Sequence, residues 1–215
     1  MRAVVGGNAV GTGKMTAGWR KTRKTFRHGN LAGALVDCAI ARLEADGAEA
    51  LSLRELARDT GVNHRAVYRH FSDKLSLLAR VAEEGWRQLE RRVKQQMRGK
   101  QAGEPMLVAA GIGFYLFARD NPNLFALMAS PRINLQGAFP GLESAMVETL
   151  EMFRRPFIDS GLELQTTRVR AALFVSALQG VTTQILHGRL HVSRANAKIS
   201  SRRPAACCSK DCASA

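Results

Sequence analysis

The stretch LRELARDTGVNHRAVYRHFSDK, residues 53–74, decides the fold of the unit around it. It holds two short segments with helical apolar spacing, and a four-residue turn containing Gly61 joins them, which is typical of a helix-turn-helix. Ala57 is small enough to let two helices cross closely, Gly61 can adopt a left-handed backbone at the turn, and Val67 can point inward. The bulky polar residues of the second segment then face outward, which indicates a partner outside the protein.

Helical periodicity continues along the chain, and no alternating strand pattern is present. We expect helices over residues 31–45, 53–59, 63–70, 73–97, 105–119, 122–129, 142–158 and 166–186. Ser52 and Glu55 predict a capping box for the second helix, and Asn63 and Ser72 predict the N-caps of the third and fourth. The fold class is therefore all-α: an N-terminal three-helix helix-turn-helix domain, followed by a helical ligand-binding and dimerisation domain. The expected divisions are a disordered basic arm (1–28), the helix-turn-helix domain (29–76), the effector and dimerisation domain (77–192) and a disordered basic tail (193–215).

The net charge of +14 is concentrated at the two ends of the chain. Residues 1–36 hold seven basic residues and no acid, and residues 187–215 hold six basic residues and one acid. A basic arm beside a folded unit suits a polyanion such as DNA, although a solubilising tail is the alternative for the C-terminal end. No uninterrupted apolar run approaches the ~20 residues of a membrane span, so we expect a cytoplasmic protein without a membrane partner.

Residues 29–78 resemble the DNA-binding domain of the TetR family of bacterial transcription regulators. The family pattern has a Leu-Ala pair, a Gly-Val pair and a Tyr-x-His-Phe run followed by a lysine. The corresponding residues here are Leu56-Ala57, Gly61-Val62, Tyr68-Arg69-His70-Phe71 and Lys74. Residues 110–128 are also similar to the start of the ligand domain in one branch of the family. That branch carries a Trp and a His-Gly pair late in its last long helix, whereas the corresponding stretch here has Gln179-Gly180 and no Trp.

The resemblance implies a set of DNA-binding residues. Bases would be contacted by Arg54, His64, Arg65 and Ala66. The DNA backbone would be held by Ser52, Asn63, Tyr68, His70, Lys74 and the arm residues Lys24 and Arg27. Lys74 lies where a helix begins, and the free N–H groups and dipole of a helix N-terminus also favour phosphate. Two alternatives stay open: Tyr68 and His70 could pack between helices, and Arg54 could pair with Glu55 or Asp59.

The resemblance further implies a homodimer and a small hydrophobic effector. The last long helix is apolar nearly all round, so one face can pack on its own domain while a second face needs another cover. Burial within a monomer is the alternative. The expected effector site is lined by Phe114, Phe117, Phe125, Met128, Met146 and Phe153, each of which could instead be plain core.

The expected function is thus sequence-specific binding to a double-stranded DNA operator, as a repressor that the effector releases. No catalytic arrangement, phosphate-binding loop or metal-ligand spacing is present in the sequence, so we expect no enzyme activity, no cofactor and no metal. Two alternatives belong to other classes of protein: one coats DNA or RNA with little sequence preference, and the other is a helical interaction adaptor that does not touch nucleic acid.

Overall fold

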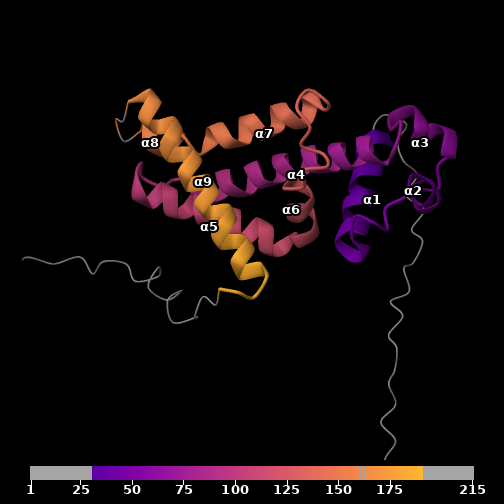
Figure 1. Cartoon of the computed structure of the whole chain (residues 1–215), viewed down its shortest axis with the longest axis horizontal. Helices are drawn as coiled ribbons and strands as arrows, with labels where there is room; N and C mark the ends of the chain where they lie inside the picture. The colour runs from indigo at the N-terminus through magenta and orange to yellow at the C-terminus, as the bar shows by residue number, and fades with distance from the viewer. Residues whose placement is uncertain (1–30, 160, 162, 191–215) are drawn as a thin grey trace, which may run out of the picture.

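The computed structural model describes residues 31–159, 161 and 163–190, and all regular elements in these ranges are helices (Figure 1). The helices are α1 (Leu31–Asp46), α2 (Leu53–Thr60), α3 (His64–His70), α4 (Lys74–Met97), α5 (Glu104–Asp120), α6 (Pro122–Met128), α7 (Pro140–Met152), α8 (Arg155–Ile158) and α9 (Leu164–Leu186). The all-α prediction is confirmed. Most predicted helix ends lie within a residue or two of the observed ones.

One predicted helix, over residues 142–158, is wrong because the chain breaks it in two. Helix α7 ends at Met152, and the short helix α8 starts at Arg155 with Pro156 in its first turn. Proline has no N–H to donate to the carbonyl four residues earlier, and its ring collides with that carbonyl. Pro156 therefore cannot lie in the interior of a helix that continues from Met152.

The predicted capping box of α2 and the predicted N-cap of α4 are also wrong. Ser52 precedes α2 but makes no side-chain cap bond, so the expected capping box with Glu55 does not form. Helix α4 is capped by Asp73 rather than Ser72: Ser76 N donates to Asp73 Oδ1 at 2.7 Å, and Asp73 N donates to the Ser76 hydroxyl. The carboxylate outcompetes the neighbouring hydroxyl because it is the stronger acceptor and carries the charge that a helix N-terminus attracts.

Helix α4 is the central element: α7 runs along one side of it, α5 and α6 lie on the other, and α1 packs near its start (Figure 1). Leu77 and Val81, in the first two turns of α4, are fully buried. Gly85 lets α6 approach closely, because a Cβ there would lie 2.8 Å from Met128 Sδ. Both halves of the chain therefore pack on α4, and the expected domain division at residues 76 and 77 falls inside it.

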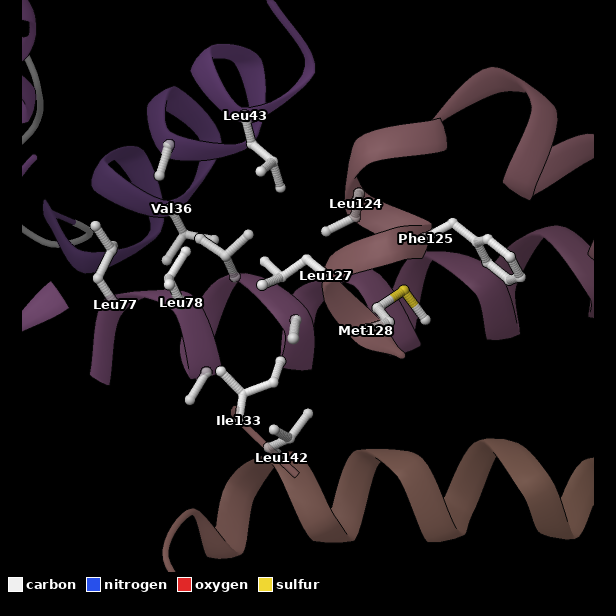
Figure 2. Packing of buried hydrophobic residues seen from close by; sticks show 14 of the residues in the cluster. Val36, Leu43, Leu77, Leu78, Leu124, Phe125, Leu127, Met128, Ile133 and Leu142 are labelled. Atoms are coloured by element: carbon white, nitrogen blue, oxygen red, sulfur yellow. The ribbon is translucent and has the colours of Figure 1, made fainter. Parts of the chain in front are cut away.

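One apolar cluster joins α1, the first half of α4, α6 and the start of α7. Figure 2 shows Leu43 of α1 pointing toward Leu124 of α6, with Leu78 and Leu127 beside them and Leu142 below. Leu43 and Leu124 are fully buried, and Leu78, Leu127 and Leu142 are nearly so. The helix-turn-helix unit is thereby packed directly onto the effector half.

Candidate nucleic-acid interface

The turn between α2 and α3 has the geometry that the sequence predicts. Gly61 is in the left-handed region (φ 69°, ψ 21°), and Val62 N donates to Ala57 O at 3.0 Å across it. Asn63 caps α3, because its side chain accepts from Arg65 N at 2.9 Å. Ala57 and Val67 are buried where the two helices cross. The direction in which α3 projects is therefore fixed by a turn, a cap and a packed crossing.

The exposed face of α3 carries cationic and aromatic side chains. His64, Arg65, Tyr68, Arg69 and His70 are exposed, and Ala66 is half-buried. The His64 and Tyr68 rings lie one helical turn apart with their centroids at 4.5 Å. The exposure of Tyr68 and His70 argues against the alternative that they pack between helices.

Arg54 is exposed at the start of α2, and it makes no ion pair among the described residues. The alternative pairing with Glu55 or Asp59 does not occur. Asp59 pairs with Arg42 of α1 at 2.7 Å, and Glu55 lies 3.5 Å from the same guanidinium and 3.6 Å from that of Arg58. These acids tie α2 to α1 and leave Arg54 available to a partner.

Lys74 has partners within the chain. Its ammonium donates to the Glu49 carbonyl oxygen at 2.9 Å and lies 4.0 Å from the Glu49 carboxylate. The hydrogen bond from Ser76 N holds the pKa of the Asp73 carboxyl below its ordinary value. The N-terminus of α4 thus already faces the Asp73 carboxylate. A phosphate bound there would have to share the helix N-terminus with Asp73 and compete with Glu49 for the Lys74 ammonium.

The remaining predicted DNA contacts divide into two groups. Ser52 is half-buried and Asn63 exposed, both at the ends of the two helices. Lys24 and Arg27, with the rest of the basic arm and the basic tail, lie outside the described residues. Arg69 was not among the predicted contacts, although it is exposed and has no ion-pair partner in the described part of the chain. Its position on α3, directly after the predicted contact Tyr68, is the sequence feature that could have indicated it as a DNA contact.

The predicted effector residues are brought together only in part. Phe114, Phe125 and Phe153 form an aromatic cluster: the Phe114 ring lies 5.6 Å from Phe125 and 6.2 Å from Phe153, both edge to face. Phe174 of α9 and Phe157 of α8 extend this cluster, and neither was predicted to line the site. The rest of the predicted set comprises the buried Phe117 and Met128 and the half-buried Met146.

Helix α9 has two apolar faces, as expected. Ala171 and Phe174 face α5 and α8, whereas Val169, Leu173 and Val181 are 56%, 65% and 49% exposed. By length and mean hydropathy, α9 is also long and apolar enough to cross a membrane, although it holds no uninterrupted apolar run of that length. Such a helix is weak evidence for a membrane span, because a covered helix of a soluble protein has the same composition.

No group of three or more His, Cys, Asp or Glu side chains in the described ranges could hold a metal ion. Cys38 of α1 is half-buried rather than fully buried, and burial raises the pKa of its thiol. The three other cysteines lie beyond the described residues.

Fold and surface together define a helix-turn-helix protein with a helical second unit. Residues 35–81 match the model of the bacterial regulatory proteins of the tetR family, and this range spans the helix-turn-helix and the start of α4. The helix-turn-helix part of the chain is therefore similar to the DNA-binding domain of the tetR family of bacterial regulators. Regulators of this family bind DNA and respond to ligands, and they are typically not enzymes. The branch with the Trp and His-Gly residues stays a prediction.

Solved structures share the fold over most of the chain. A protein of unknown function from Rhodococcus sp. RHA1 is 25% identical, with 83% of this chain and 94% of that one covered and a TM-score of 0.69. The fatty acid degradation regulator FadR from Bacillus halodurans is 16% identical (81% and 94% covered, TM-score 0.60). A single-residue variant of TetR from Acinetobacter baumannii AYE, in complex with minocycline, is 18% identical (78% and 84% covered, TM-score 0.53).

Proposed function

We propose that this protein is a cytoplasmic, homodimeric repressor that binds one DNA operator through α2 and α3 and leaves it when a small apolar effector binds. The observation that carries the proposal is the exposed face of α3, on which Arg65 has no ion-pair partner in the described part of the chain. A guanidinium that projects from a helix can donate two hydrogen bonds to a guanine edge in the major groove. Arg54, His64 and Ala66 would add base contacts around it.

The DNA backbone would be held by residues at the edges of the same surface. Ser52, Asn63, Tyr68 and His70 lie at or near the ends of α2 and α3, and Lys74 would exchange Glu49 for a phosphate. Lys24 and Arg27 of the basic arm would add contacts that do not depend on sequence. In this division, phosphate contacts set the register and α3 reads the bases.

A dimer would place two such surfaces on one operator. The exposed apolar face of α9 is a surface that a two-fold copy can cover, since the same patch serves both partners. Two recognition helices in a dimer reach successive major grooves when they are about 34–36 Å apart.

The effector would enter the aromatic cluster between α5, α6, α8 and α9. Apolar rings from α5, α6, α8 and α9 suit an apolar molecule. The ligand complex of the A. baumannii protein supports ligand binding in this fold.

Selection of bound fragments from genomic DNA tests the proposal directly. A specific regulator should recover one or a few sites and prefer them about 10³-fold or more over random duplex at physiological salt. Equal binding to all duplexes would instead identify a coating protein, and no duplex binding at low salt would identify an adaptor. Small apolar compounds can then be scored by release of the selected operator.

A further inference from the structure

The start of α6 is capped from the helix-turn-helix unit. The first N–H groups of a helix have no partner inside it and need an outside acceptor. The residue at the α6 N-cap, Asn121, makes no cap bond, because its side-chain amide donates to Phe117 O. Glu44 of α1 takes the role: Leu124 N donates to its Oε1 at 2.7 Å, and Asn123 N donates to its Oε2 at 3.3 Å.

A third bond fixes the same contact from the other side. The Asn123 side-chain amide donates to the Glu44 carbonyl oxygen at 3.1 Å. A carboxylate that accepts backbone N–H groups forms stronger hydrogen bonds than a neutral acceptor, and it is further favoured by the dipole at a helix N-terminus. The contact is therefore directional, and α6 cannot shift along or away from α1 without breaking it.

The chain that leaves α6 is attached to the same part of the helix-turn-helix unit. Arg132, in the loop after α6, pairs with Glu49, which lies in the connection between α1 and α2. Arg132 Nη1 is 3.1 Å from Glu49 Oε1. Both side chains are largely exposed, so this pair alone contributes little to stability. It nevertheless places the start of α6 and the loop that follows α6 against residues 44–49, and Glu49 is also the partner of Lys74.

The middle of α6 faces the proposed effector site. Phe125 lies edge-on to Phe114, and Met128 lies against Gly85 of α4. Leu124, next to the capped N–H groups, points toward Leu43 of α1 in Figure 2. A molecule that entered the aromatic cluster would have to move Phe125, and the helix that carries Phe125 is the helix that Glu44 caps.

We propose that Glu44 is a positioning residue that couples α6 to the DNA-binding unit, so that the position of α6 and the affinity for the operator depend on each other. The proposal rests on the proposed function. Coupling between two sites is reciprocal: if α6 affects operator binding, operator binding must affect α6. The test can therefore be done without an identified effector.

The experiment measures amide hydrogen exchange of residues 123–128 in the full chain, free and bound to the operator recovered from genomic DNA. In the wild type, operator binding should slow exchange at Leu124 by about 5-fold or more, the lower end of typical couplings. Glu44→Ala should abolish this response, and Glu44→Gln should retain part of it because the amide oxygen can still accept one bond. Asp37→Ala is the matched control: it removes an exposed acid from the same helix and should leave the response unchanged.

The possible outcomes separate the two proposals. Operator binding with no change at Leu124 in the wild type, or with the full change kept in Glu44→Ala, would overturn the coupling and leave the repressor proposal standing. Recovery of no operator would overturn both. Far-UV circular dichroism checks folding, and if Glu44→Ala is unfolded, the partial response of Glu44→Gln decides.

Discussion

At the scale of single residues, the arginines of α2 and α3 are available to DNA only if the nearby acids are paired with other residues. Arg42 holds Asp59 and lies near Glu55, so α2 is tied to α1 and Arg54 has no acid left beside it. Arg65 is likewise without an ion-pair partner within the described ranges, whereas Lys74 is engaged by Glu49. An arginine without internal partners can bind a base edge with no internal bond to break first.

Removing the Arg65 guanidinium should weaken and broaden DNA binding. We expect Arg65→Ala to cost about 1–3 kcal/mol on the selected operator and to relax the preference for the base that it contacts. Arg91→Ala is the control, since Arg91 is equally cationic but lies far along α4, paired with Glu84. Titrations with the operator and its single-base variants measure both effects. Unchanged affinity of Arg65→Ala would show that α3 does not read the operator through this residue.

At the scale of elements, two short helices depend on their ends. Helix α3 is only seven residues long, so its Asn63 cap is a large share of its local hydrogen bonding. Asn63→Ala should lower the free energy of unfolding by about 0.5–2 kcal/mol. Ser52→Ala at the equivalent position of α2 should have a smaller effect, because Ser52 makes no side-chain cap bond. Urea unfolding without DNA measures both, and equal losses would contradict the assignment of the caps.

The cap of α4 predicts an acid dependence of stability. The hydrogen bond from Ser76 N holds the pKa of the Asp73 carboxyl below its ordinary value of 3.8, so the folded state favours the carboxylate. The stabilisation is then complete above this value and is lost as pH falls through the lower folded-state pKa. The difference in unfolding free energy between the wild type and Asp73→Asn should be constant from about pH 5 to 7 and should shrink below about pH 4. Asp37→Asn is the matched control, because it removes an exposed acid of α1 that has no observed cap role.

Sequence alone predicted α2, α3 and the exposed face of α3, because these features follow from the local spacing of residues around Gly61 and Val67. It failed where the answer depends on a residue far away in the chain. Ser72 was the predicted cap of α4, and the folded geometry shows that Asp73 takes this role instead. The Glu44 cap of α6 joins residues about 80 positions apart, and no local pattern announces it. The break before Pro156 has a local cause, since proline cannot continue that helix.

At the scale of the whole molecule, α4 and α6 connect the helix-turn-helix unit to the helices that follow it. Helix α9 carries an apolar face that its own protomer leaves exposed. Helix α4 runs from its Asp73 cap, next to α3, to the contacts with α5 and α7, and Glu44 adds a second connection through α6. A change at the aromatic cluster therefore has two routes to α3.

The exposed apolar face of α9 should hold the dimer together. Leu173 is 65% exposed, near its centre, and Leu173→Asp would place a carboxylate there that a second copy must bury without a partner. We expect this variant to be a monomer at micromolar concentration by light scattering and to lose operator affinity, because one protomer reaches only one half-site. Leu135→Asp is the matched control, because Leu135 is 48% exposed but lies in the connection between α6 and α7. The Leu135→Asp protein should remain dimeric. A wild-type protein that is already monomeric would contradict the dimer, and sedimentation of the wild type with liposomes would assign this face of α9 to lipid instead.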